Sequence, residues 1–137
     1  MTTQFLRQWG THKMAGQMTK SAKTKAADTA EFLVRFKDAL ARIPKREERQ
    51  FATVFEHGTL AVEMYTPKEI DRQQPHTRDE VYIIARGEGE FVYADQRVKF
   101  AAGDFLFVPA GLPHRFEKFS KDFATWVMFY GPEGGEK

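Results

Sequence analysis

The stretch Gly103–Phe116, GDFLFVPAGLPHRF, joins a strand-like segment to a turn and then to a histidine. Its first part, DFLFV, is a short apolar and aromatic run, which is typical of a buried β-strand. The Pro and Gly residues from Pro109 to Pro113 predict a turn, because they favour the backbone angles that turns need. His114 follows this turn, where a second strand would begin. We therefore expect a strand–turn–strand unit that aims the His114 side chain inward.

A second histidine lies upstream, in the stretch QPHTRDE (Gln74–Glu80), just before the strand-like run VYIIA. Side chains alternate between the two faces of an extended strand, so residues an even number apart point to the same side. Gln74, His76 and Glu80 have this spacing. If the segment is extended, all three side chains can face one cavity.

His76, Glu80 and His114 together form a candidate metal site. Two imidazoles and one carboxylate from different strands suit a divalent first-row metal and leave coordination positions open. The chain has no cysteine, so a thiolate site, a cysteine nucleophile and a disulfide framework are excluded. The alternative is a barrel without an ion, in which the histidines hydrogen-bond to the glutamate. We favour the ion because a carboxylate in an apolar interior needs a cation or several donors.

The strand-like pattern continues over most of the chain. Apolar runs separated by turn residues predict about eight short strands, at the spacing typical of a sandwich or barrel. His57 and Gly58 are expected in the first hairpin turn, where glycine supplies a positive φ. A second corner is expected at Gly87 and Gly89, and a third at Asp95-Gln96. The runs, which fall within residues 51–131, are FATVFE, TLAVEMY, EVYIIA, EFVYA, RVKF, DFLFV, HRFEKF and FATWVMFYG.

Residues 1–27 contain no acidic residue and no apolar periodicity. This composition is typical of a segment that does not order itself, so we interpret it as a flexible basic extension. Five basic residues and one acid give residues 1–30 a net charge of +4, whereas the whole chain carries +2. A transit peptide is a weaker interpretation, because such peptides are rich in arginine. An upstream start codon, with Met14 or Met18 as the alternative start, is a further explanation.

An amphipathic helix and a charged link are predicted within residues 28–50. Asp28 or Thr29 can cap the helix and Pro44 can end it. An apolar stripe of this kind needs cover, either from the barrel or from a second subunit. Residues 132–137 form a short C-terminal tail. The apolar positions at helical spacing are Phe32, Leu33, Phe36, Leu40 and Ile43.

Two motifs in this chain resemble those of the cupin superfamily. The residues His76-x3-Glu80-x6-Gly87 resemble the second half of the first cupin motif, and Gly103-x5-Pro109-x-Gly111-x2-His114 resembles the second motif. The 15 residues between them, Glu88 to Ala102, are a usual length for small cupins. Two spaced motifs in the right order are far more specific than either alone. The resemblance covers roughly residues 51–130.

The resemblance implies an all-β fold, the double-stranded β-helix or jelly-roll barrel, here preceded by one α-helix and the flexible tail. It also implies that His76, Glu80 and His114 bind one ion near the mouth of the barrel; in cupins this ion is Mn, Fe, Ni, Zn, Co or Cu. Two positions depart from the pattern. Gln74 stands in place of the first motif histidine, and Lys118 stands where an asparagine often ends the second motif. An amide oxygen is a poorer donor than imidazole, so Gln74 is either a weak fourth ligand or a group that orients a ligand or bound water.

Several functions are compatible with such a barrel. One is a metal-dependent enzyme, such as a dioxygenase or isomerase, that acts on a small oxygenated molecule. Another is a small-molecule binding module without catalysis, with or without metal, and a third is a stability or storage role. The fold does not select among them. Tyr82, Phe116 and Trp126 are expected to line the pocket, with core packing as the alternative, and no catalytic residue is assigned.

The remaining expectations concern partners. A net charge of +2 does not indicate nucleic acid, and the apolar runs are far shorter than the roughly 18 residues of a membrane helix. We therefore expect a soluble, cytoplasmic protein that binds a small molecule and neither nucleic acid nor membrane. The helix stripe and the strands with two apolar faces offer more apolar area than one small barrel needs. A homodimer is the expected assembly.

Overall fold

The structure, a computed structural model, describes residues 31–46 and 50–137. The predictions of a flexible extension over residues 1–27 and of a helix cap at Asp28 or Thr29 lie outside these residues. The chain divides into two compact units, Met1–Arg35 and Phe36–Lys137. The second unit contains the eight strands found in the described residues and the candidate site.

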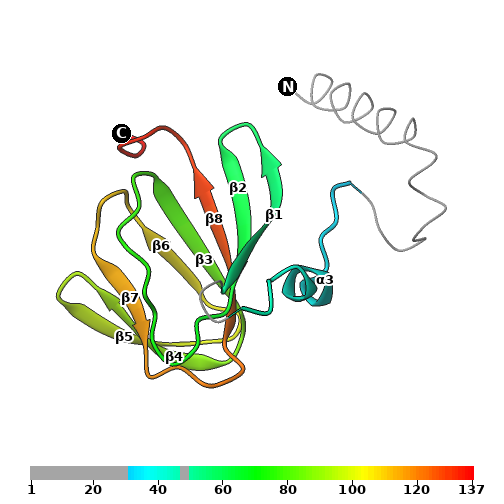
Figure 1. The fold of residues 1–137 in the computed structure, drawn as a ribbon. Helices are drawn as coiled ribbons and strands as arrows, with labels where there is room; N and C mark the ends of the chain where they lie inside the picture. The colour runs from blue at the N-terminus through cyan, green and yellow to red at the C-terminus, as the bar shows by residue number, and fades with distance from the viewer. Residues whose placement is uncertain (1–30, 47–49) are drawn as a thin grey trace. The chain divides into compact units, whose positions relative to one another are not determined.

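One short helix and eight antiparallel strands make up the described part of the chain (Figure 1). The all-β jelly-roll fold expected from the sequence is therefore confirmed. Each predicted strand is present, and the ends differ from the predicted ones by one or two residues. The elements are α3 (Phe36–Ala41), β1 (Phe51–His57), β2 (Leu60–Tyr65), β3 (Asp79–Arg86), β4 (Glu88–Tyr93), β5 (Gln96–Ala101), β6 (Phe105–Val108), β7 (His114–Glu117) and β8 (Ala124–Tyr130).

The strands form two sheets. The larger has the order β1-β2-β8-β3-β6, and the smaller has the order β5-β4-β7. The last strand, β8, lies between β2 and β3, so the two ends of the barrel sequence are joined in one sheet. Strands β3 and β4 are consecutive but belong to different sheets, and Gly87 alone separates them. Figure 1 shows the smaller sheet opposite β3 and β6 of the larger one.

Aromatic side chains fill the space between the sheets. This packing follows from alternation along each strand, which sends every second side chain inward. On β3, for example, Tyr82 and Ile84 are 0% and 2% exposed, whereas Ile83 between them is 39% exposed. The core consists of Tyr82, Ile84, Phe91, Phe100, Val108, Phe116, Phe123 and Val127.

Two corners differ from the prediction by one residue. The first hairpin turn is Gly58-Thr59 and not His57-Gly58, because His57 still pairs with Leu60. The third turn is Ala94-Asp95, because Gln96 already pairs with Tyr93. In both hairpins only the first residue of the turn has a positive φ, which is the φ pattern of a type II′ turn and not of type I′.

Gly87 is required by space as well as by backbone angle. Its φ is +92°, and a Cβ atom there would lie 2.7 Å from the Cα of Phe123. The sharp corner between the sheets therefore depends on glycine at this position. Lys118 has a φ of +49°, in the left-handed region that asparagine tolerates better than most residues. Lys118 therefore adopts the left-handed conformation although it departs from the motif's asparagine.

The helix is shorter than the apolar spacing predicts. It begins at Phe36, whereas Phe32 lies in a turn and Leu33 in an isolated bridge. Helical spacing shows where apolar residues can share a face, but a six-residue helix depends on tertiary packing. That packing starts at Phe36, whose ring centroid lies 6.4 Å from that of Trp126, and includes Ala39, which is fully buried. No helix in the described residues is long and apolar enough to cross a membrane.

The side of the larger sheet that faces away from the core, here called the outer face, is apolar across all five strands. Paired residues on antiparallel strands point to the same side, so the strand register defines two rows. Helix α3 contacts β2 and packs on Trp126, but Ile83, Phe105 and Phe107 remain exposed at the β3–β6 edge. The rows are Ala52, Met64, Trp126, Ile83 and Phe105, and Phe55, Val62, Met128, Val81 and Phe107.

Candidate metal centre

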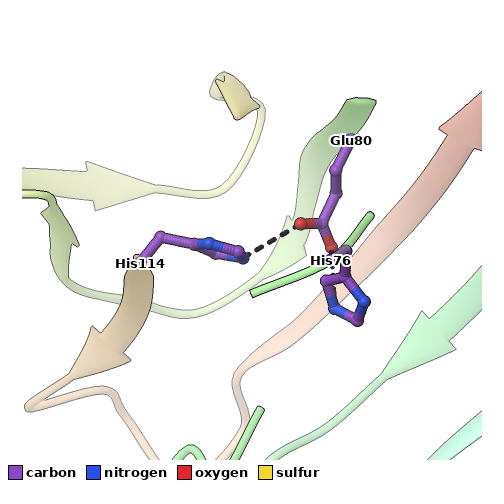
Figure 2. A group of neighbouring side chains, drawn as sticks. All are labelled: His76, Glu80 and His114. Atoms are coloured by element: carbon purple, nitrogen blue, oxygen red, sulfur yellow. Dashed lines mark ion pairs between the residues drawn. The ribbon is translucent and has the colours of Figure 1, made fainter. Parts of the chain in front are cut away.

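Three side chains from separate segments converge at one end of the barrel, as Figure 2 shows. Glu80 is the second residue of β3, His114 is the first residue of β7, and His76 lies in the irregular segment before β3. Each offers one ligand atom, and these atoms all lie within 4.8 Å of one another. The backbone also joins the segments, because Gly111 N–H donates to the His76 carbonyl at 2.7 Å. The structure thus brings together the three residues that the sequence singles out.

The carboxylate of Glu80 lies between the two imidazoles. His114 Nε2 is 2.9 Å from Glu80 Oε1, and His76 Nε2 is 3.7 Å from Glu80 Oε2. The side chains of His114 and Glu80 are 1% exposed, whereas that of His76 is 37% exposed. The ring of His76 also packs edge-on against Phe129, with a centroid distance of 4.6 Å. Two of the candidate ligands are therefore buried inside the barrel, and the third lies at its opening.

Glu80 is a buried carboxylate without donors. Neither of its oxygens has a hydrogen-bond partner among the described residues, although both atoms are buried. The 2.9 Å contact to His114 Nε2 is a hydrogen bond only when that nitrogen carries a proton. Leaving an ionised carboxylate in this state is costly, since buried charges in proteins are normally paired or bound to a metal.

The tautomer of His114 follows from its other contact. Its Nδ1 lies 2.7 Å from the carbonyl oxygen of Leu112, which can only accept a hydrogen bond. Nδ1 therefore carries the proton, and in the neutral ring Nε2 has a free lone pair. This lone pair faces Glu80 Oε1 at 2.9 Å. Two lone pairs at that distance repel unless a cation lies between them, either a proton on Nε2 or a metal ion.

The histidine pKa values move in opposite directions. Burial lowers the pKa of His114, but its contact with Glu80 and its bond to the Leu112 carbonyl together raise it, and the net result is a pKa above the usual value. Burial is the largest influence on His76 and keeps its pKa below the usual value, although the charge of Glu80 opposes this. In the absence of an ion, His114 is therefore the imidazole that holds a proton most readily.

A cavity of about 810 Å³ opens beside the cluster, and both His76 and Glu80 line it. Phe51, Val127 and Phe129 give it apolar walls, and its charged groups are Glu63, Lys68, Glu69 and Arg72. Burial, and after it the charge of Glu80, raises the pKa of the Glu63 carboxyl. Polar and charged residues therefore outnumber the apolar ones around the cavity, which suits a small molecule with several polar groups.

Gln74 does not join this cluster, in contrast to the prediction. It is exposed and does not line the cavity. The prediction assumed an extended strand from residue 74 to residue 80, but the segment is irregular and bends at Thr77 and Arg78, so strand alternation does not extend across it. Its neighbour Gln73 lines the cavity and bonds to Tyr82. Sequence alternation alone gave no signal for Gln73.

The three predicted pocket residues have different positions. Phe116 is 1% exposed and packs in the core, with its ring centroid 4.9 Å from that of Tyr82. Trp126 points to the outer face, on the other side of β8 from Val127 and Phe129, so its assignment to the pocket is wrong. Tyr82 is fully buried, but its hydroxyl lies 3.0 Å from His114 Nε2. It belongs to both the core and the candidate centre.

Residues 61–130, just over half of the chain, match the model of the cupin domain family. An uncharacterized protein of Streptomyces coelicolor is 36% identical over 63 residues, which are 46% of this chain and 60% of that protein. The chain therefore matches less than two thirds of the length of this relative.

Solved structures of low sequence identity share the fold. A protein of Neisseria meningitidis is similar with a TM-score of 0.58 and 18% identity, and the match covers 72% of this chain and 99% of that one. A cupin-2 domain containing protein from Shewanella frigidimarina is similar with a TM-score of 0.57 and 16% identity, covering 72% and 95%. At these identities the similarity establishes the architecture and nothing about chemistry.

Proposed function

We propose, from the premise that this chain belongs to the cupin domain family, that it binds one divalent first-row transition metal and uses it in catalysis on a small oxygenated molecule. The ligands are His76, Glu80 and His114. The observation that carries the proposal is the state of Glu80, whose two buried oxygens have no donor among the described residues and face two imidazoles. A cation of this kind removes the cost of that buried charge.

The donor set fits such an ion. Two imidazole nitrogens and a carboxylate oxygen suit Mn, Fe, Co, Ni, Cu or Zn. They do not suit calcium, a hard ion that prefers sites built from oxygen ligands. His114 has its lone pair directed at the centre because its Nδ1–H is bonded to Leu112. This bond fixes the ring orientation and tautomer, as partners of metal-binding histidines commonly do.

The cavity supports catalysis on a small molecule. When bound, the ion polarises an oxygen of the substrate or, if it is redox-active, activates dioxygen. The apolar walls at Phe51, Val127 and Phe129 suit the carbon skeleton of a substrate. Glu63 is the candidate for proton transfer, because it lines the same cavity and its pKa is raised by burial and by the charge of Glu80.

The proposal is tested by metal loading followed by ligand screening. Protein stripped with a chelator is dialysed against each divalent ion separately, and elemental analysis is expected to find close to one equivalent. The loaded and stripped forms are then compared for binding and conversion of small hydroxy- and oxo-carboxylic acids, by calorimetry and chromatography. Conversion only in a loaded form supports the proposal. Ion-dependent binding without conversion would identify a binding module instead, and failure to hold any ion would contradict the metal centre.

We also propose that the protein is a homodimer formed through the outer face. Ile83, Phe105 and Phe107 are 39%, 62% and 42% exposed there, and they adjoin each other on β3 and the edge strand β6. Neither of the two rows of the outer face contains a charged residue, so this face does not favour a charged partner. An uncharged apolar patch is complementary to a copy of itself across a twofold axis.

Phe107→Glu is expected to give a monomer, because a twofold axis would place the two carboxylates in or near the same apolar contact. Sedimentation velocity at several concentrations measures this directly. The matched control is Phe55→Glu, at the other end of the same row, where a smaller effect on assembly is expected. A wild-type chain that sediments only as a monomer would contradict the proposed dimer.

A further inference from the structure

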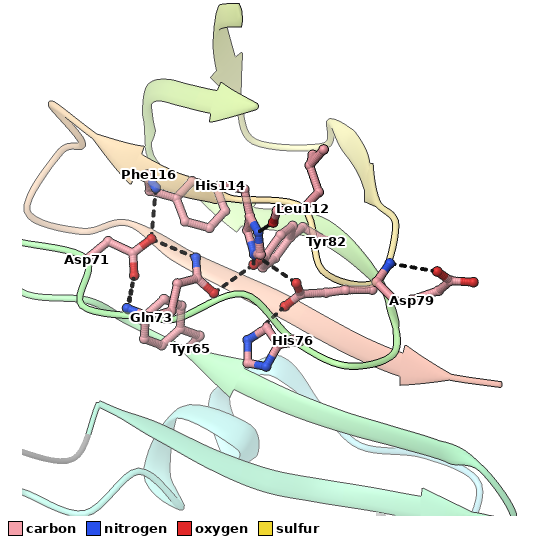
Figure 3. A network of polar contacts seen from close by, with 11 residues as sticks. Tyr65, Asp71, Gln73, His76, Asp79, Tyr82, Leu112, His114 and Phe116 are labelled. Carbon is pink, nitrogen blue, oxygen red and sulfur yellow. Dashed lines mark hydrogen bonds and ion pairs between the residues drawn. The ribbon is translucent and has the colours of Figure 1, made fainter. Parts of the chain in front are cut away.

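We infer that the hydroxyl oxygen of Tyr82 is a fourth donor to the metal centre, held in place by Asp71 and Gln73. This inference rests on the proposed metal centre and adds a ligand to it. The network that carries it runs from Asp71 through Gln73 to Tyr82 and His114, as Figure 3 shows. In each hydrogen bond of this network, the chemistry of the two groups determines which one donates.

Asp71 is the residue of the network whose role as a hydrogen-bond acceptor is certain. It is 7% exposed, and its carboxylate accepts hydrogen bonds from the Tyr65 hydroxyl at 2.5 Å and from the backbone N–H of Phe116 at 2.8 Å. It also accepts from the backbone N–H and the side-chain amide of Gln73, at 3.1 Å and 2.6 Å. A carboxylate with several donors is stable as an anion, so it acts here only as an acceptor.

This arrangement determines how the Gln73 amide is turned. Its NH₂ group must face Asp71, because only the nitrogen can donate to a carboxylate. Its Oε1 then faces Tyr82, whose hydroxyl lies 2.8 Å away. An amide oxygen cannot donate, so the single proton of the Tyr82 hydroxyl must point at Gln73. The network therefore fixes the Tyr82 hydroxyl as a donor on one side only.

The lone pairs of the Tyr82 oxygen are left for the candidate centre. That oxygen lies 3.0 Å from His114 Nε2, which is also a lone-pair atom when the ring is neutral. Glu80 Oε1 lies 2.9 Å from the same nitrogen. While His114 is neutral, three acceptors therefore meet with no proton between them, and either a proton on Nε2 or a metal ion relieves this arrangement.

The spacing of these atoms is that of neighbouring ligands. A tetrahedral site would separate two donors that lie about 2.1 Å from the ion by about 3.4 Å, whereas a six-coordinate site would separate adjacent donors by about 3.0 Å. The distances of 2.9 Å and 3.0 Å from His114 Nε2 both agree with the six-coordinate value. The phenol stays neutral, with its proton on the hydrogen bond to Gln73, so the donor brings no additional charge.

The position of Tyr82 also accounts for a missing ligand. Gln74, which occupies the place of the first motif histidine, is exposed and does not line the cavity. Without another donor the protein would supply three ligands. Tyr82 comes from β3, two residues after Glu80, and belongs to the core and not to the lining of the cavity that His76 borders. The cavity side is then left for substrate.

The test uses the full chain with Co(II) as the probe. Tyr82→Phe removes one oxygen and keeps the ring, which packs against Phe91 and Phe116. We expect Co(II) affinity, measured by competition with a chelator, to fall by about 10-fold to 100-fold, as for the loss of a group that supports a metal site. The visible absorption of bound Co(II) should also shift, because it depends on the ligand set.

Two further variants make the result interpretable. Gln73→Leu removes the acceptor of the Tyr82 proton and is expected to shift the Co(II) absorption with the phenol still present, so the test does not depend on the folding of one variant. Gln74→Ala, one residue away and exposed, is the matched control and should leave affinity and spectrum unchanged.

The outcomes separate this inference from the metal centre itself. Wild-type protein that binds Co(II), with Tyr82→Phe unchanged in affinity and spectrum, would overturn the role of Tyr82 and leave the proposed function standing. A weaker affinity with an unchanged spectrum would overturn it too, because Tyr82 would then act only by positioning His114. Wild-type protein that does not bind Co(II), or any other divalent ion, would contradict both proposals.

Discussion

Glu80→Gln is expected to abolish measurable ion binding and, at a pH where His114 is neutral, to leave the metal-free protein at least as stable as the wild type. The change removes the charged ligand from the centre, and the loss of affinity should be at least 100-fold, more than for the loss of a supporting group. It also removes a buried charge that has no donor among the described residues. Loss of function with no loss of stability is the signature of a residue kept for its chemistry.

Asp79, next to Glu80 in sequence, provides the matched control. It is also buried, but its carboxylate accepts hydrogen bonds from the backbone of Ala110 at 2.9 Å and of Glu136 at 2.8 Å. Asp79→Asn should therefore cost about 1–3 kcal/mol of unfolding free energy, because one backbone donor loses its acceptor. Ion binding should be retained. Urea unfolding of the stripped proteins and elemental analysis of the loaded ones measure the two effects.

Comparison of the two variants distinguishes a metal ligand from a structural carboxylate. If Glu80→Gln and Asp79→Asn both lowered stability and both retained the ion, Glu80 would be a structural carboxylate and the centre would lie elsewhere. If both lost the ion, the effect would come from disturbance of β3 and not from the ligand itself.

The sequence was sufficient to predict the strands because their signals are local. Alternating apolar residues and short turn-forming stretches define β1 to β8, and the errors are shifts of one or two residues at the ends. His114 is a similar case, since the Pro and Gly residues before β7 place it at a strand start. Two spaced motifs supplied the family, which the match over residues 61–130 confirms.

The errors arose where local periodicity was applied beyond a regular element. Strand alternation was extended through the bend at Thr77 and Arg78, and it selected Gln74 instead of Gln73. Trp126 was placed in the pocket for being aromatic, although its position on β8, between Thr125 and Val127, gives it the opposite face. The predicted helix was too long because apolar spacing does not show which residues pack against another element.

The polar network could not be predicted for a different reason. Asp71 and Gln73 carry no pattern of their own, and their partners Tyr65, Tyr82 and Phe116 lie on three other strands. Such contacts depend on how distant segments pack. The network shows that the segment before β3 is tied to the core by a buried carboxylate, and this tie determines how the ligands of the candidate centre are held.

The stability added by a bound ion is expected to increase with pH, while the stability of the stripped protein decreases over the same range. The pKa of His114 is raised by its contacts with Glu80 and Leu112, which outweigh the effect of burial. A raised pKa contributes stability that is fully present below the unfolded value of about 6.5 and is lost as pH rises through the folded value. His76, whose pKa is lowered by burial, opposes this, but it is more exposed.

Ion binding has the opposite pH dependence, because it takes place at Nε2 of His114, the nitrogen that the proton would occupy. An ion needs the neutral imidazole, so at pH 5.5 it must displace the proton that His114 holds, whereas at pH 8 it meets a free lone pair. Thermal unfolding with Zn(II) and with a chelator, at pH 5.5, 6.5, 7.5 and 8.0, measures the difference. An ion at about 100 times its dissociation constant adds about 2.7 kcal/mol, and this increment should be largest at pH 8.0. His57→Gln, in the exposed first hairpin, should leave both trends unchanged. An increment independent of pH would mean that the ion does not bind at His114.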